Sequence, residues 1–490
     1  MLKEWSSRLR EMELSRLLFG AYSGLCLLSI SAAVASGYYY LVGIPIVLLV
    51  IYVAIVDFRS LFYLLLCCLP LSTEIVLPGG FGTDLPTEPL MVGLMLILVL
   101  FFISGTRSFS LKQFWHPITF LLLLHLSWVY LTSITSNLFF VSLKFSLAKT
   151  WYIVVFYFLA AYLLRETREQ RRLFWLVFLP LLFTVVITMI RHAGYGFSFV
   201  GIHKVLHPFQ RNHVNYAAML TLMMPFLWFA WRRQAYRSFP WWFLLGSFAI
   251  MLVAIYLSFT RAAYIALFAG IAAYFAFRLK LIRYLIAGGI VAAVVGLGYM
   301  VQQNRYLDYA PNYDRTVTHY EFDNLVEATY KMEDISTMER LYRWVAGLKM
   351  SPEEPWVGFG PGNFVNFYRS YTVTRFETYV SDNPEQSGIH SYFLMTLVEQ
   401  GIIGLLIFLL FNFFLLIKGE QIFHETLDPV RQGIVMSAIL CLVIINIFLL
   451  INDLIETDKV GPFYFLSAAL LLNIDQQNRQ SATKRIAAKS

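Results

Sequence analysis

The sequence has few charged residues, and this shortage narrows the class of protein. Charged residues make up 14% of the 490 residues, against about 25% in a typical soluble domain. Hydrophobic residues make up 58%, above the roughly 45–50% of soluble domains. Apolar runs long enough to cross a bilayer recur along the chain, so a soluble enzyme is excluded and a membrane protein is expected.

Cysteine is also scarce, and its positions exclude two kinds of structure. All four cysteines lie inside apolar runs, at Cys26, Cys67, Cys68 and Cys441. Their positions suit neither a disulfide framework nor the ligand spacing of a zinc site. We therefore expect no disulfide and no zinc centre.

About fourteen apolar runs predict membrane-spanning helices. The runs are continuously apolar, whereas the strands of a membrane barrel alternate in polarity over about ten residues. Since a span takes about 20 residues, the short runs at 60–77 and 263–277 are the least secure. We expect an all-α polytopic membrane protein with about 12–14 transmembrane helices. The runs lie at residues 17–35, 37–56, 60–77, 88–104, 117–134, 147–164, 173–191, 214–230, 240–258, 263–277, 281–300, 391–417, 433–451 and 460–474.

The first run allows a second interpretation. Basic residues up to Arg16, an apolar run from Leu17 and the small residues at 33–35 resemble a cleavable signal peptide. Three glutamates lie before the run, and the leader of a signal peptide is basic. A retained first helix is therefore favoured.

The basic residues orient the helices. With the N-terminus in the cytoplasm, 23 of the 38 Lys and Arg residues fall on the inner side, and every inner loop has at least one. This agrees with the positive-inside rule for an even number of spans and two cytoplasmic termini. The net charge of +8 is then first a topology signal, and nucleic acid is a poor candidate partner. The expected organisation is transmembrane helices 1–11 in residues 1–300, an outer loop or lid in 301–389, helices 12–14 in 390–475 and a cytoplasmic tail in 476–490.

One outer loop, residues 191–213, is basic and contains no Asp or Glu. It holds Arg191, Lys204 and Arg211 together with four histidines, the last of which is His213. Positive charge outside opposes the bias that sets topology, so the loop is a candidate anion-binding site. Attraction to lipid headgroups is the simpler alternative.

Three further residues near the outer face could carry chemistry. Arg261 follows the polar segment 258–260, although a lone arginine there can also snorkel to the interface. His390 directly precedes a long apolar run, where it could be a general base or only a hydrogen-bonding residue at a helix start. Glu399 lies deeper in that run, as a structural partner or as part of the site.

Arg211, Arg261 and His390 together suit the transfer of a group from a diphosphate. The arginines would neutralise the phosphates, and His390 would take the proton of the acceptor hydroxyl. No cluster on the outer face is assigned to a metal, and no cofactor is expected.

The long outer segment should have structure of its own. Residues 336–339, Ser-Thr-Met-Glu, form a capping box that starts an amphipathic helix ending near Met350. A tight turn rather than a nucleotide site is expected at 358–364, which lacks the dinucleotide-binding fingerprint. The apolar face of the helix carries Met338, Leu341, Tyr342, Val345 and Leu348.

These motifs resemble the O-antigen ligase and O-antigen polymerase superfamily of bacterial inner-membrane glycosyltransferases. The most specific match is His390-Ser391, nine residues, and then Gly401-Ile402-Ile403-Gly404. The resemblance runs from about Arg211 to Gly404, while the first 150 residues agree only in hydropathy. Supporting matches are Arg211-Asn212-His213-Val214-Asn215-Tyr216-Ala217, Ser258-Phe259-Thr260-Arg261, and Arg343-Trp344 with the segment 358–364.

The resemblance implies a GT-C-type helical fold, with a periplasmic loop covering a cavity open to the lipid. It also implies metal-independent transfer of a glycan from undecaprenyl diphosphate at the bacterial inner membrane. His390 matches the essential histidine of the family, and Arg211 and Arg261 match its diphosphate-contacting arginines. Further candidates for substrate binding are Lys204, His213, Arg191 and Glu399.

The acceptor separates the members of the family. Ligases use a sugar of lipid A-core and polymerases use another lipid-linked repeat unit. A ligase is favoured by the single outer histidine motif and one dominant outer segment, and a protein O-oligosaccharyltransferase is a close variant. A flippase or transporter for lipid-linked glycans is the rival from another class, but no internal repeat with broken helices is seen.

Overall fold

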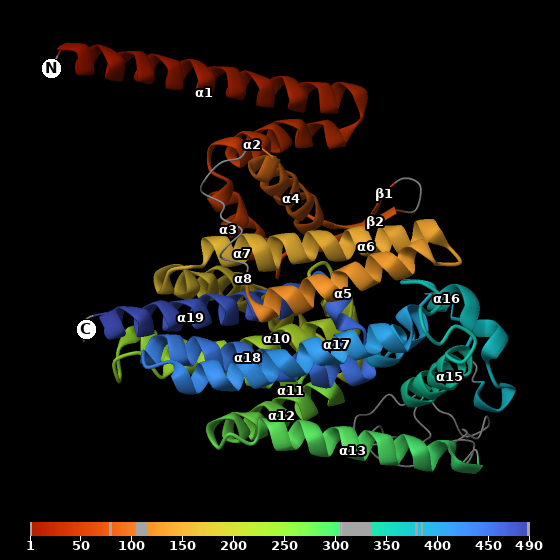
Figure 1. Ribbon diagram of the computed structural model, residues 1–490. Coiled ribbons are helices and arrows are strands. Elements are labelled where there is room, and N and C mark those ends of the chain that lie inside the picture. Colours follow the sequence, from red (N-terminus) through yellow and green to blue (C-terminus); the bar gives the residue numbers. More distant parts are fainter. Residues whose placement is uncertain are drawn as a thin grey trace.

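The computed structural model describes residues 2–77, 81–103, 115–303, 305, 335–377, 381–383 and 386–487. The described chain is almost entirely helical, so the expected all-α polytopic fold is confirmed (Figure 1). The first half contains α1 (Leu2–Ser36), η1 (Tyr39–Val42), α2 (Gly43–Val56), α3 (Phe58–Cys68), β1 (Thr73–Leu77), β2 (Phe81–Leu85), α4 (Thr87–Ile103), α5 (Pro117–Ile134), α6 (Phe139–Ile153), the π-helical η3 (Val154–Leu159), α7 (Ala160–Leu163), α8 (Thr167–Ala193), α9 (Phe199–Val205) and α10 (His213–Trp231). The second half contains α11 (Phe239–Tyr256), α12 (Arg261–Arg278), α13 (Ile282–Val301), α15 (Ile335–Met350), α16 (Phe364–Phe367), η6 (Tyr368–Tyr371), η7 (Thr374–Phe376), α17 (Tyr392–Glu425), α18 (Pro429–Ile451), η8 (Leu454–Glu456) and α19 (Gly461–Ala487).

Each of the fourteen apolar runs overlaps at least one helix. Among the described residues, eleven helices are long and apolar enough to cross a membrane. The other three runs correspond to the shorter α3 and α4 and to α19, which continues through the expected tail. The insecure run at 263–277 is a full span, α12, whereas the run at 60–77 divides into α3 and strand β1.

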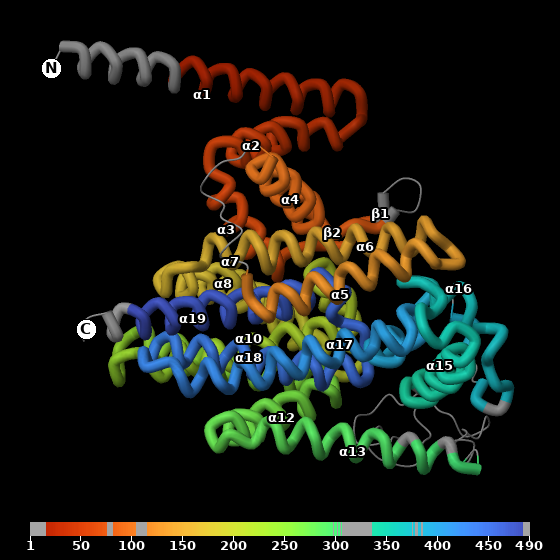
Figure 2. Tube along the Cα trace, viewed as in Figure 1, coloured from red at the N-terminus to blue at the C-terminus, as the bar shows by residue number. Residues whose placement is uncertain are grey.

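The bundle is organised around α18. This helix packs against α10, α12, α17 and α19, and Figure 2 shows it among the closely packed helices of the C-terminal half. Its buried residues lie on every side, which is typical of a helix at the centre of a membrane bundle. Helices α1 and α2 lie apart from this core (Figure 1), and only 11% of each span is buried. Lipid is therefore their natural environment.

Helix α15 forms a separate layer at one end of the bundle, beside α16 (Figure 1). It ends at Met350, as the sequence predicts, but begins at Ile335, so Ser336 lies inside its first turn rather than before it. Met338, Tyr342 and Val345 are buried, which confirms the predicted apolar face. Leu348 was expected on the same face and is exposed, because α15 packs on α17 and η6 through a narrower stripe.

The loop that follows α15 is joined to a break in α17. The amide of Phe359 donates to the carbonyl of Val398 at 3.0 Å, and Gly360 donates to Glu399 at 2.9 Å. On the other side of the break, Ile402 donates to Pro355 at 2.8 Å. The outer segment is thereby fixed to a transmembrane helix through backbone hydrogen bonds.

The glycines of this junction have a geometric role. Gly401 has φ 69°, and a Cβ there would overlap the carbonyl of Trp356. Gly358, Gly360 and Gly362 also have positive φ, which confirms the predicted tight turn. Gly404 lies against the indole of Trp128, which donates to the carbonyl of Gln400 at 3.0 Å. The two glycines that follow His390 therefore fit the packing of the break.

Replacing Gly401 by alanine should destabilise the protein. The added methyl group meets backbone atoms and forces a left-handed conformation, each worth about 1–3 kcal/mol. The thermal unfolding midpoint of the purified protein should therefore fall clearly. Gly246→Ala in α11 is the matched control, because that glycine has open space around its Cβ position. Equal midpoints for the two variants would contradict the role of Gly401.

Candidate active site

His390 lies directly before α17, in a backbone held by α15. Its φ of 56° is unusual for a residue other than glycine, and such outliers concentrate at functional sites. Arg343 donates to the carbonyl of Gly388 at 3.2 Å, and the Trp344 indole donates to the carbonyl of His390 at 3.4 Å. The Nδ1 atom of His390 is buried and has no hydrogen-bond partner among the described residues. This nitrogen therefore has free hydrogen-bonding capacity within that part of the chain.

Burial and the positive charges of two arginines in α15 lower the pKa of the His390 ring. Burial lowers the pKa of His390 to about 3, and the positive charges of Arg340 and Arg343 act in the same direction. The imidazole is consequently neutral at ordinary pH and able to accept a proton. Sequence reasoning noted Arg343 only as part of a family motif and did not select Arg340, although their spacing of three places them on one side of a helix.

Arg261 and His213 lie at the starts of two neighbouring helices. His213 is the first residue of α10, Arg261 is the first residue of α12, and the Thr260 hydroxyl donates to the carbonyl of His213 at 3.2 Å. Arg261 and Arg340 both interact electrostatically with His213. The His213 ring also packs on His203, with ring centroids 4.6 Å apart. Arg340 therefore acts electrostatically both on His213, which lies beside Arg261, and on His390.

Arg211 approaches the site from another direction. Its side chain is 64% exposed and forms a loose ion pair with Glu74, with Nε and Oε2 3.6 Å apart. Burial raises the pKa of Asp453, and the nearby Glu456 raises it further. The positive charges of Arg343 and Arg211 act on the same carboxyl group in the opposite direction, so both arginines lie near Asp453. An exposed ion pair of this kind contributes little stability, so the guanidinium can exchange Glu74 for another anion.

Three helix N-termini contribute further positive potential. Helices α10, α12 and α17 all begin among these residues, and the N-terminus of a helix favours an anion through its free amides and dipole. Four arginines, Arg211, Arg261, Arg340 and Arg343, lie around the same region. The arrangement is suited to binding a doubly charged phosphate group beside a neutral imidazole.

Glu399 has a structural set of contacts. Its carboxylate accepts hydrogen bonds from the backbone amides of Gly362 at 2.8 Å and Phe364 at 3.1 Å. The residue is buried at the break in α17. Of the two roles that the sequence left open, this geometry favours the structural one, which fixes the loop after α15.

Arg191 and Lys204 lie farther along the basic loop. Arg191 donates to the carbonyl of His207 at 2.9 Å and so supports the fold of the loop. Lys204 lies over the ring of Tyr195, at 5.6 Å from the ring centroid, and is exposed. Neither contact joins these residues to His390.

A buried polar cluster behind His390 was missed by sequence reasoning. The Lys149 ammonium donates to the Tyr392 hydroxyl at 2.6 Å and to Glu456 at 2.5 Å. The Tyr392 hydroxyl donates to Glu456 at 2.7 Å. A lysine inside an apolar run was the only available signal, since buried charges in membrane helices are paired or functional. The cluster holds the start of α17 against α6 and η8.

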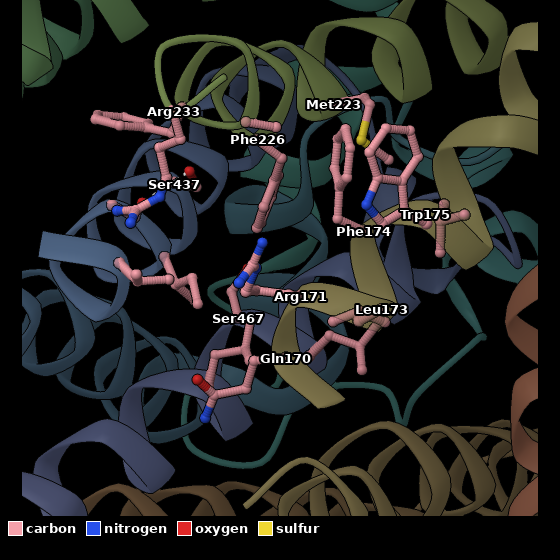
Figure 3. A pocket seen from close by; sticks show the side chains of 18 of the residues that line it. Gln170, Arg171, Leu173, Phe174, Trp175, Met223, Phe226, Arg233, Ser437 and Ser467 are labelled. Carbon is pink, nitrogen blue, oxygen red and sulfur yellow. Dashed lines mark hydrogen bonds between the residues drawn. The ribbon is translucent and has the colours of Figure 1, made fainter. Parts of the chain in front are cut away.

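A cavity of about 210 Å³ lies near the C-terminal end of α10, whereas His213 is at the start of that helix. The cavity is lined by aromatic side chains together with Arg171 and Arg233. Figure 3 shows the side chains around it. It lies between α8, α10, α18 and α19. None of the site residues chosen from the sequence lines it, so we place the chemistry at the His390 end.

The part of the chain that the structure describes contains no group of three or more His, Cys, Asp or Glu residues positioned to hold a metal ion. Positive charge at the His390 end comes from arginine side chains and helix termini instead.

The region that contains His390 matches a known protein family. Residues 246–409 match the family model described as O-antigen ligase. This match places residues 246–409 of the chain in the O-antigen ligase superfamily. The match includes Arg261, Arg340, Arg343 and His390, while Arg211 lies before it. A search of curated proteins finds no match.

The matched family indicates the general class of activity. Its members are glycosyltransferase-like enzymes, either ligases or polymerases, that use lipid-linked glycans. The His390 end of the bundle is therefore a candidate glycosyltransferase site in a multi-pass membrane protein.

His390 should remain reactive toward diethyl pyrocarbonate in mildly acidic solution, because the reagent modifies neutral imidazole. An ordinary histidine loses about tenfold in rate between about pH 7.5 and pH 5.5. With its pKa lowered to about 3, His390 should keep its rate, measured by mass spectrometry of its peptide and corrected with N-acetylhistidine. A tenfold fall in the His390 rate would contradict the low pKa.

Proposed function

We propose that the protein transfers a polysaccharide from undecaprenyl diphosphate to a sugar hydroxyl of lipid A-core. The reaction takes place at the periplasmic face of the inner membrane, with both termini of the chain in the cytoplasm. The observation that carries the proposal is the unpartnered, buried Nδ1 of His390 beside Arg340 and Arg343. A neutral base next to fixed positive charge is what transfer from a diphosphate requires.

The arginines and the helix N-termini hold the donor diphosphate. Arg261 and Arg340 share His213 as a neighbour, and Arg340 also acts on His390, so phosphate bound between them lies close to the base. Arg211 leaves its exposed contact with Glu74 to join them. Guanidinium groups bind phosphate oxygens in pairs of hydrogen bonds, which fixes the donor in orientation as well as position. We propose that the transfer needs no metal.

His390 then acts as the general base. It takes the proton of the acceptor hydroxyl as that oxygen forms a bond to the anomeric carbon of the donor sugar. The bond from this carbon to the diphosphate oxygen breaks, and its electron pair leaves with undecaprenyl diphosphate. The proton on His390 passes to water after the product leaves.

Donor binding should make His390 a stronger base. Arg340 and Arg343 disfavour the protonated form of His390. A bound diphosphate offsets their charge, which raises the pKa of His390 toward the working pH, where a general base is most effective. The base is thus activated when the donor is in place.

The direct test is transfer by the purified protein supplied with lipid-linked glycan and lipid A-core. Glycan-capped core is the expected product, and lengthened lipid-linked polymer would identify a polymerase instead. His390→Ala should reduce the rate by about 10²–10⁴-fold, the usual contribution of a general base. His424→Ala, at the other end of α17, is the control. Full activity of His390→Ala at normal protein levels would remove the base assignment.

Arginine replacements test the diphosphate contacts. Arg211→Lys and Arg261→Lys keep the charge but lose paired hydrogen bonding, so each should lower kcat/KM for the donor by about tenfold or more. Arg369→Lys, an exposed arginine of the outer segment, should have no effect. Wild-type kinetics in both test variants would indicate that these arginines only meet the membrane interface.

A further inference from the structure

A cavity of about 460 Å³ lies beside Arg211 and outside the His390 site. It is formed where the β1–β2 pair meets the residues before α10 and the residues from η8 to α19. Its volume is within the roughly 300–1,000 Å³ of small-molecule sites. The lining residues are Ser72, Glu74, Asp84, Glu88, Tyr152, His207, Pro208, Phe209, Gln210, Arg211, Asn215, Glu456, Thr457, Asp458 and Lys459.

The cavity wall is rich in hydrogen-bond acceptors. Five carboxylates line it, against Arg211 and Lys459 as the fixed cations. The Lys459 ammonium is already occupied, since it donates to the carbonyls of Leu69 and Ser72 at 2.9 Å and pairs with Asp458 at 3.2 Å. Glu74 is paired with Arg211 and Glu456 with Lys149, so Asp84 and Glu88 are the wall carboxylates without an ion pair among the described residues.

Two buried amide side chains indicate that the cavity suits a ligand with hydrogen-bond donors. Gln210 is 4% exposed and Asn215 is 6% exposed, and both line the cavity. In the described part of the chain, neither the Oε1 atom of Gln210 nor the Oδ1 atom of Asn215 has a hydrogen-bond partner. A buried acceptor without a partner costs about 1–3 kcal/mol, so a ligand that donates hydrogen bonds here is favoured.

The carboxylates are distributed around the cavity and already have protein partners. Glu88 accepts from the hydroxyl of Thr83 at 2.7 Å, and Asp458 accepts from Ser72 at 2.6 Å. Burial, with Asp458, Glu88 and Glu74 nearby, raises the pKa of Asp84 to about 7. Among the described residues no such group is arranged to hold a metal ion. A ligand with several separate donors fits this wall better than a single cation.

We propose that this cavity binds a sugar residue of the glycan substrates through its hydroxyl groups. Sugar hydroxyls donate to carboxylate and amide oxygens, and the rings of Tyr152 and Phe209 offer apolar surface to the sugar ring. The surplus of carboxylates selects uncharged or amino-substituted sugars and repels those with a carboxylate, sulfate or phosphate. Arg211 lies in the wall, so the bound sugar is next to the diphosphate of the proposed reaction, on which this inference rests.

Binding can be measured without transfer. Saturation-transfer NMR on the full-length protein in nanodiscs should detect methyl glucoside and methyl glucosaminide, but not methyl glucuronide. Asp84→Asn and Gln210→Leu should each weaken methyl glucoside binding by roughly tenfold, because each removes an acceptor. Asp382→Asn, an exposed aspartate of the outer segment, is the matched control and should bind like the wild type. Thermal midpoints of all variants report whether they are folded.

Several outcomes would overturn the proposal. These are equal binding of the glucuronide, unchanged binding by both folded variants, or calcium binding that Asp84→Asn abolishes while no glycoside binds. His390→Ala should still bind methyl glucoside, so loss of transfer in that variant concerns the reaction and not the cavity. In transfer assays, a KM raised for lipid-linked glycan alone assigns the sugar to the donor, and a KM raised for lipid A-core alone assigns it to the acceptor.

Discussion

Positive charge held at one end of an apolar helix bundle is the constraint on which the site depends. Arginines are costly to bury, and here they are placed where three helices begin, so their charge adds to that of free backbone amides. Such a region lowers the pKa of a nearby histidine and attracts an anion for the same electrostatic reason. The neutral His390 and the proposed diphosphate site are therefore two consequences of one arrangement.

The outer segment gives this arrangement its geometry. Arg340 and Arg343 come from α15, which is fixed to α17 through the loop after it. Glu399 and Gly401 form the attachment, one by accepting two amide hydrogen bonds and the other by allowing close backbone approach. A glutamate and a glycine deep in a transmembrane helix thus control side chains at its surface. This explains physically why glycines follow His390 at a fixed spacing.

Charge of the opposite sign lies directly beside the arginines. Glu74 contacts Arg211, and Asp453 lies within the influence of both Arg211 and Arg343. The basic loop is free of acids in sequence but not in space, because the β1–β2 pair and η8 supply them. Positive and acceptor-rich surfaces in contact suit a substrate that joins a diphosphate to a neutral sugar.

Much of the fold followed from the sequence, because continuous apolar runs and the amphipathic pattern of α15 are local signals. His390 and Arg261 could be selected as candidate site residues because they border such runs. Arg340 and the Lys149 cluster were missed, and Arg343 was noted only within a family motif, since their meaning depends on contacts with residues far away in the chain. Leu348 was placed on the wrong face because helical spacing does not give the width of a packing stripe. The contacts of Glu399 could not be predicted, because its partners Gly362 and Phe364 belong to the segment after α15, far from Glu399 in the sequence.

The position of the donor diphosphate tests the central claim most directly. A cryo-electron microscopy structure of the protein with undecaprenyl diphosphate would locate its two phosphorus atoms. The account predicts both phosphates at the His390 end, within hydrogen-bond distance of Arg261 and Arg340. Phosphate density in the cavity of Arg171 and Arg233, with the His390 end empty, would contradict it.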